Sequence, residues 1–235
     1  MTGLLSAITA KIDDVLASVQ RTGDTLTMLA ARAESGGDTL TRDDLAPLRA
    51  LAGATLTAHD GFVAGAGAVL APGVLSDAPR WIEWWWGGSR RGQEPERLRV
   101  DLDPASAEFT DYTSMEWYRE PERSGRWTIT GPYVDYICTH EYTFTLALPV
   151  RCGSLFVGVS GADILATQVE RLVLPDLALL GGDAVLTSAS GRVIASNTVR
   201  FLPGEIAPPG ELVEASEGTL PWRLLLIPRV RTPAP

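Results

Sequence analysis

An apolar seam at the N-terminal end constrains the fold more than any other feature of the chain. Its side chains recur at alternating intervals of three and four residues: Leu5, Ile8, Ile12, Val15, Val19, Thr22, Leu26, Leu29 and Ala33. On a helix, this heptad-type spacing places all of them on one face. The seam therefore predicts one long N-terminal helix whose apolar face must be buried.

The seam has two candidate partners. One is a second helix after Gly36-Gly37, with an N-cap at Thr41, acidic residues at 43 and 44, and leucines at 45, 48 and 51. The other is the same helix of another subunit, which would give a homodimer, or a signalling partner docked on these helices. The sequence leaves both open.

Beyond residue 79 the chain changes to short segments rich in β-branched and aromatic residues. We expect strands at 81–86, 97–102, 126–130, 137–150, 155–159, 184–187, 192–195 and 222–227, with hairpin turns at 151–154 and 188–191. A short helix is expected at 164–173, ended by Pro175. Residues 60–79, rich in Gly and Ala, fit a helix tail or a close-packed connection. The predicted fold class is α+β, an antiparallel sheet preceded by long helices, with a helical region at 1–79 and a sheet domain at 80–235.

The net charge of −9 excludes some partners. A chain of this charge with one lysine, Lys11, is not expected to bind nucleic acid. The longest uncharged run, between Asp60 and Asp77, is too short to span a membrane. The N-terminus lacks the pattern of a secretory signal. We therefore expect a cytoplasmic protein, or an extracellular one if a leader has been removed.

Residues 109–136 concentrate aromatic and acidic side chains. The segment FTDYTSMEWYREPERSGRWTITGPYVDY contains Tyr112, Trp117, Tyr118, Trp127, Tyr133 and Tyr136, with Asp111, Glu116 and Asp135 among them. Aromatic faces and carboxylates are the materials of a site for a small organic cation. The alternative is that these aromatic residues form core.

The order of motifs in this region resembles the Cache family, whose domains have a PAS-like fold. DYTSMEWYREPERSGRWTITGPYVDY is followed by THEYTFTLALPV and GSLFVGVSGADI, and later by the hairpin GDAVLTSASGRVIASN. The resemblance covers roughly residues 80 to 228, and the N-terminal helices resemble the long helix that precedes such domains. It implies a non-catalytic sensor that binds amino acids, amines or small carboxylates.

The resemblance also implies a set of ligand-binding residues. Tyr112, Trp117 and Tyr118 come from the helix motif, Tyr133 and Asp135 from the Pro-Tyr-x-Asp strand, and Asp163 would accept an ammonium group. Amino-acid-binding members carry an arginine where this chain has Met115. Without that guanidinium, an amine is favoured over an amino acid, and a carboxylate or uncharged ligand is favoured least. Arg119, Arg123 or Arg126 could restore an anion site.

Signals for catalysis are weak. The chain has only two histidines, His59 and His140, and each is expected to be structural or solvated. No metal-ligand spacing or phosphate-binding loop occurs. Cys138 and Cys152 fit buried thiols or a disulfide between neighbouring strands. We expect no catalytic residue, no metal and no cofactor. The alternatives to a sensor are an enzyme of unrecognised type using carboxylates such as Asp101 and Asp103, and an oligomerising scaffold assembled through the seam.

Overall fold

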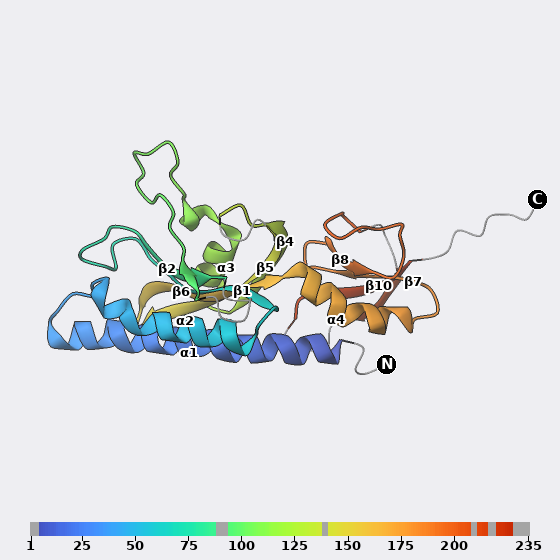
Figure 1. The fold of residues 1–235 in the computed structure, drawn as a ribbon, viewed down its shortest axis with the longest axis horizontal. Helices are drawn as coiled ribbons and strands as arrows, with labels where there is room; N and C mark the ends of the chain where they lie inside the picture. Colours follow the sequence, from blue (N-terminus) through green and yellow to red (C-terminus); the bar gives the residue numbers. More distant parts are fainter. Residues whose placement is uncertain (1–4, 88–93, 138–140, 208–210, 216–219, 228–235) are drawn as a thin grey trace, which may run out of the picture. The chain divides into compact units, whose positions relative to one another are not determined.

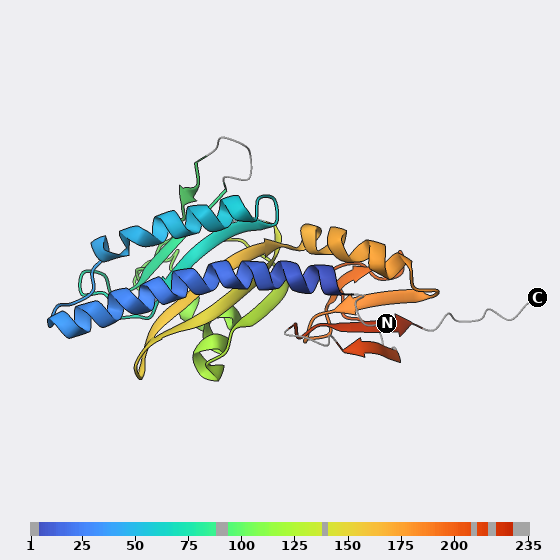
Figure 2. The same ribbon diagram turned by 90° about the horizontal axis from the view of Figure 1, so that it is seen from below.

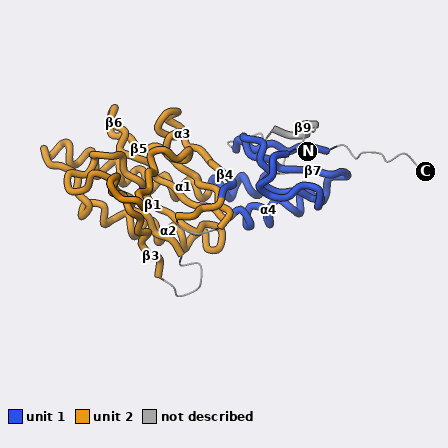
Figure 3. Tube along the Cα trace, turned by 90° about the horizontal axis from the view of Figure 1, so that it is seen from above, with its two compact units in different colours: residues 1–13, 131–133, 166–235 blue, residues 14–130, 134–165 orange. Residues whose placement is uncertain are grey.

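The computed structural model describes residues 5–87, 94–137, 141–207, 211–215 and 220–227, and Figure 1 shows their fold. The chain forms two compact units, coloured in Figure 3. Unit 2 comprises residues 14–130 and 134–165, and unit 1 comprises residues 1–13, 131–133 and 166–235. The boundary expected between residues 79 and 80 falls inside unit 2.

The N-terminal seam forms one helix, α1 (Ser6–Gly36), as predicted. Within unit 2, its residues Val15, Val19 and Leu26 are buried in the chain's own core. Leu26 packs in a cluster with Leu48 and sheet residues that include Ala68. The apolar seam is thus used within the chain, which favours the intramolecular partner over another subunit.

The second helix is α2 (Ala46–Ala58), which a 3₁₀ turn, η1 (Asp43–Leu45), precedes. The predicted cap at Thr41 is wrong, because Thr41 donates instead: its N–H and hydroxyl both bond the Asp44 carboxylate, at 2.9 and 2.6 Å. At its other end, α2 is tied to α1 by the buried pair Ser18 Oγ and His59 Nε2, 2.9 Å apart. His59 therefore has a structural contact in the helix pair.

A six-stranded sheet, of which all but residues 131–133 of β4 lies in unit 2, has the order β3-β2-β1-β6-β5-β4. Its strands are β1 (Val63–Leu70), β2 (Trp81–Trp86), β3 (Glu96–Arg97), β4 (Thr128–Val134), β5 (Tyr142–Cys152) and β6 (Leu155–Leu165). The pairs from β3 to β5 are antiparallel. Helix α2 packs on β1 and β2, and α3 (Glu116–Ser124) packs on β5 and β6 from the opposite face, as Figure 2 shows.

Three elements differ from the strand predictions, and one of them, residues 211–215, is a strand of unit 1 that was not predicted. Residues 63–70 form the central strand β1, which was missed because its sequence, VAGAGAVL, is rich in small residues. All eight residues are buried, since helices cover one face and large side chains cover the other. Residues 97–102, predicted as a strand, contribute only Arg97 to the two-residue strand β3.

Unit 1 contains α4 (Ala166–Ala178) and a four-stranded sheet in the order β8-β7-β10-β9. Its strands are β7 (Asp183–Thr187), β8 (Val193–Ser196), β9 (Glu211–Ala215) and β10 (Arg223–Ile227). The prediction that Pro175 ends the helix is wrong, because α4 continues through it for three residues. The α+β class with antiparallel sheets is confirmed. None of the helices described is long and apolar enough to cross a bilayer.

Side chains alternate along β2, as expected for its tryptophan run. Trp84 joins the cluster under α3, whereas Trp85 lies on the side of α2. On the α3 face, the strand register creates three rows of neighbours that run across the sheet. Row 1 is Trp86, Gly65, Asp163 and Thr145; row 2 is Trp84, Gly67, Gly161 and Ala147; row 3 is Ile82, Val69, Val159 and Pro149.

Gly67, the β1 residue of row 2, predicts a large loss of stability on substitution. A Cβ added at Gly67 would overlap the Glu83 carbonyl oxygen and lie 2.8 Å from Trp84 Cα. We expect Gly67→Ala to lower the free energy of unfolding by about 3 kcal/mol or more. The control is Gly53→Ala, in α2, where a Cβ meets nothing within 4 Å. It should stabilise by about 0.5–1 kcal/mol. Urea unfolding distinguishes the two, and equal midpoints would contradict this account.

Candidate functional site

Asp163 is the most unusual ionisable group among the described residues of unit 2. It lies on β6 in row 1, buried to 7% exposure, and its Oδ1 accepts a 2.7 Å hydrogen bond from Thr145 Oγ1 on β5. Asp135, just after β4, is also buried, at 8% exposure, and its negative charge acts on Asp163. We call Asp135 and Asp163 the acid pair.

The pKa of Asp163 is raised to about 7: burial is the largest cause and the charge of Asp135 adds to it, whereas hydrogen bonds from Thr145 and Trp84 lower it. The physical cause is that a carboxylate loses hydration in a buried position and is repelled by a neighbouring negative charge. Near pH 7 the group is therefore divided between its acid and carboxylate forms. A bound cation would favour the carboxylate form.

Aromatic residues from the α3 region gather over row 3. The ring centroid of Tyr118 lies 5.4 Å from that of Tyr112, 6.2 Å from that of Trp117 and 5.6 Å from that of Phe156, all in edge-on geometry. Such edge-to-face contacts are a favoured arrangement of aromatic rings. With Trp84, these four form the aromatic cluster.

Two tyrosines of the cluster use their hydroxyls differently. Tyr112 donates to the Leu70 carbonyl at 2.8 Å, so its polar tip is bound to the sheet. The Tyr118 hydroxyl is buried and has no hydrogen-bond partner within the described part of the chain. Burial raises the pKa of Tyr118 above its ordinary value. An unsatisfied buried polar group costs free energy. A polar ligand atom that bonded the Tyr118 hydroxyl would remove that cost.

Trp84 connects the aromatic cluster to the acid pair. Its ring belongs to the cluster, and hydrogen bonding from its indole lowers the pKa of Asp163. The contact requires a glycine at position 65, because a Cβ there would lie 2.6 Å from Trp84 Nε1 and 3.1 Å from Asp163 Oδ2. Sequence reasoning missed both Trp84 and Thr145 as parts of the site. Their neighbours follow from the strand register, which places Trp84 beside Gly67 of β1 and Thr145 beside Asp163 of β6.

The residues predicted from sequence fall into two groups. Tyr112, Trp117 and Tyr118 meet in the aromatic cluster, and Asp135 and Asp163 form the acid pair. Tyr133 is half-buried on β4, two residues before Asp135.

Two of the cationic side chains near α3 have acidic partners. Arg123 pairs with Glu120 on the same helix, and Met115 stands at the N-cap of α3. Arg80 pairs with Asp111 at 3.2 Å and lies over the Tyr112 ring at 5.7 Å. Arg119 lines an open hollow on the outer side of α3 together with exposed acids. These contacts give no guanidinium next to the acid pair.

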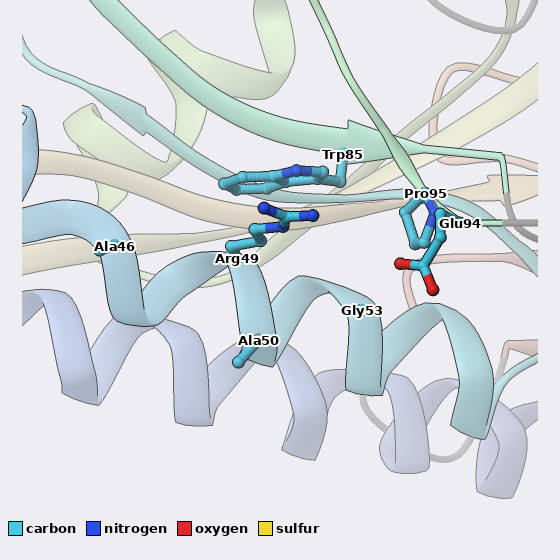
Figure 4. Close-up of a pocket in the computed structure, with 7 residues that line it drawn as sticks. All are labelled: Ala46, Arg49, Ala50, Gly53, Trp85, Glu94 and Pro95. Atoms are coloured by element: carbon cyan, nitrogen blue, oxygen red, sulfur yellow. The ribbon is translucent and has the colours of Figure 1, made fainter.

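A second hollow lies on the opposite face of the sheet, between α2 and β2, with a volume of about 300 Å³. Figure 4 shows the Arg49 side chain pointing toward the Trp85 ring, with Glu94 and Pro95 beside them. Small residues of α2 form its floor: Ala46, Ala50 and Gly53. This hollow is separate from the acid pair, which faces α3.

Residues considered for catalysis have structural partners. The side chains of Asp101 and Asp103 are exposed and accept backbone N–H groups of the same loop. Within the described residues, no cluster of side chains could hold a metal ion. Cys152 is a free thiol. His140 and Cys138 lie outside the described residues.

No family model matches the chain. Solved structures that are similar to it include three chemoreceptor proteins or domains. A methyl-accepting chemotaxis protein X has 21% identity and a TM-score of 0.58, with 97% of each chain covered. The ligand-binding domain of Pseudomonas fluorescens chemoreceptor CtaA, in complex with L-valine, has 16% identity and a TM-score of 0.57, covering 95% of this chain and 92% of that one. The ligand-binding domain of Campylobacter jejuni chemoreceptor Tlp3, in complex with L-norvaline, has 16% identity and a TM-score of 0.53, covering 83% and 67%.

These similarities concern the fold. The chain has the Cache-type fold of chemoreceptor sensory domains, with a long N-terminal helix and an antiparallel PAS-like sheet. The family resemblance found in the motifs is thus confirmed at the level of the fold.

The pKa of Asp163 predicts how stability depends on pH. The ordinary value is 3.8 and the folded value about 7, so this group favours the folded state at low pH. That contribution is lost as the pH rises through about 7. We expect the wild-type protein to lose roughly 2–3 kcal/mol relative to Asp163→Asn between pH 5 and pH 8. Urea unfolding of both proteins at the two pH values tests this. A difference that stays constant with pH would contradict the raised pKa.

Proposed function

We propose that this chain is a non-catalytic sensor domain that binds a small organic ammonium compound between the acid pair and the aromatic cluster. The observation that carries the proposal is the buried acid pair itself, in which Asp135 raises the pKa of Asp163. Two carboxyl groups placed together out of water favour a cationic ligand, because a positive charge relieves their repulsion. Aromatic faces nearby add to the attraction.

The ligand class follows from the charges near the site. Asp163 and Asp135 are proposed to accept the ammonium, with Trp117 and Tyr118 around the rest of the ligand. Tyr112 is proposed to act by positioning Tyr118, since its own hydroxyl is bonded to Leu70.

An amine is favoured over an α-amino acid by the absence of an arginine at position 115. Two similar structures contain L-valine and L-norvaline, and those ligands also present an ammonium group. An amino acid is therefore the second candidate, and it would need an anion site from Arg119 or another side chain.

A sensor must pass ligand occupancy to a partner. Because the apolar seam of α1 is used within the chain, we propose that a second copy or a signalling partner would contact the other, polar face of α1. The enzyme and scaffold alternatives make different predictions. An enzyme would convert the ligand into a product, and a scaffold would show no ligand-dependent stabilisation.

A ligand panel tests the proposal. A compound that binds the folded state at 100 times its dissociation constant should stabilise it by about 2.7 kcal/mol, seen as a rise in Tm. We expect amines to give the largest rise, and Asp163→Asn or Asp135→Asn to weaken binding on the order of 10–100-fold. The matched control is Glu83→Gln. Glu83 is about as buried as the acid pair, and its pKa is also raised. It lies on the face of the sheet that α2 covers, however, and pairs with Arg97.

Three results of this panel would contradict the proposal. The first is the absence of a rise in Tm with every amine and amino acid. The second is an equal loss of binding in Glu83→Gln and Asp163→Asn. The third is recovery of the ligand as a changed product.

Ligand affinity should depend on pH through Asp163. An ammonium group binds the carboxylate form, so binding below about pH 7 must first remove a proton from this residue. Aliphatic ammonium groups stay protonated at these pH values. Calorimetry should show affinity falling about tenfold per pH unit below pH 6 and levelling above pH 8. Affinity that is unchanged between pH 5.5 and 8 would exclude Asp163 as the ammonium acceptor.

A further inference from the structure

Row 2 of the sheet contains one large side chain among very small ones. Gly67, Gly161 and Ala147 lie in line with Trp84 on the α3 face. A Cβ added at Gly161 would lie 3.4 Å from Trp84 Cη2, and one added at Gly65 would lie 2.6 Å from Trp84 Nε1. The indole therefore reaches from β2 across β1 to β6. It is 6% exposed, so it covers the backbone that the glycines leave bare.

The polar end of the same ring faces Asp163. Asp163 Oδ2 and Trp84 Nε1 both lie beside Gly65, whereas Oδ1 accepts the Thr145 hydroxyl. Donors thus approach the carboxyl group from two sides within the sheet. A carboxylate has about four lone-pair sites, so acceptor capacity remains for an incoming N–H donor.

We propose that Trp84 is the specificity-determining residue of the ammonium site, because its indole closes the space over Gly67 and Gly161 and holds Asp163 toward the ligand. The inference rests on the proposed function and narrows its ligand class. The site takes a primary ammonium on an unbranched carbon. It rejects a branched carbon, for which the indole leaves no room, and a quaternary ammonium, which has no N–H to donate to Asp163.

Three amines of graded shape test the size limit: propylamine, isopropylamine and N,N,N-trimethylpropylammonium. Calorimetry on wild-type protein should show propylamine binding about tenfold tighter than the other two, the scale on which small differences in fit are discriminated. Trp84→Ala opens the space and should reduce the preference over isopropylamine to less than about threefold, whereas the preference over the quaternary ammonium should remain, because that ion still has no N–H to donate. Trp85→Phe, on the opposite face, is the control and should leave the ranking unchanged. If Trp84→Ala is folded by circular dichroism and keeps the wild-type preference over isopropylamine, the size limit is wrong.

A second measurement needs no ligand. Trp84→Phe keeps an aromatic ring over the glycines but removes the N–H donor. Carbon-13 NMR titration of Asp163 should show its midpoint moving to higher pH in this variant and staying in place in Trp85→Phe. An unmoved midpoint in Trp84→Phe would overturn the contact between Trp84 and Asp163.

The two measurements also separate this inference from the proposed function. If none of the amines binds the wild-type protein, the proposed function and its size limit fail, and the role of Trp84 in holding Asp163 is judged by the titration alone. If propylamine binds, but Trp84→Ala keeps the preference over isopropylamine and Trp84→Phe keeps the midpoint, the sensor function stands and the role of Trp84 falls.

Discussion

The pairing of β1 with β6 is the constraint on which the rest of unit 2 depends. Their facing residues are mostly small, as in Ala66 opposite Ala162 and Gly67 opposite Gly161. On one face of the sheet these small residues let helix α1 pack closely. A Cβ added at Gly23 of α1 would lie only 2.9 Å from Ser160 Oγ on β6. On the other face, the same small residues make room for the Trp84 indole. Small side chains at the centre of the sheet thus allow a helix on one side and an indole with a carboxylate on the other.

Burying the two carboxyl groups of the acid pair lowers the stability of the folded state, and neighbouring hydrogen-bond donors offset part of that loss. A carboxyl group without water favours its neutral form, which is why the pKa of Asp163 rises. Hydrogen bonds from Thr145 and Trp84 offset part of that rise without removing it. The remaining instability is the feature that an ammonium ligand would relieve. Stability and binding are therefore coupled at one residue, in the way often seen where a functional site departs from the most stable arrangement.

Sequence patterns predicted the helices and strands whose own residues carry a clear local signal. The seam of α1 and the strand 81–86 were placed correctly, because amphipathic spacing and β-branched or aromatic content are local signals. Strand β1 was missed, since a strand buried on both faces can be built from Gly and Ala when its neighbours supply the bulk. For the candidate site, motif order named Asp135, Asp163 and the aromatic residues near α3, and their role in binding stays a prediction. Trp84 and Thr145 depended on strand register, which no local pattern in this chain encodes.

The separation of charges within unit 2 limits the kind of ligand that the proposed site could hold. Arg80 directly precedes Trp81, which pairs with Leu70, whereas Asp163 pairs with Gly65 at the other end of β1. Five residues of a strand span about 16 Å between Cα positions. The Arg80 guanidinium pairs with Asp111 and lies over the Tyr112 ring, and the ammonium and carboxylate of an α-amino acid are attached to the same carbon. If Arg80 served as an anion site, it would therefore suit an ω-amino acid with a long chain. A simple amine needs only the acid pair, and it satisfies the observed charges with the fewest additional contacts.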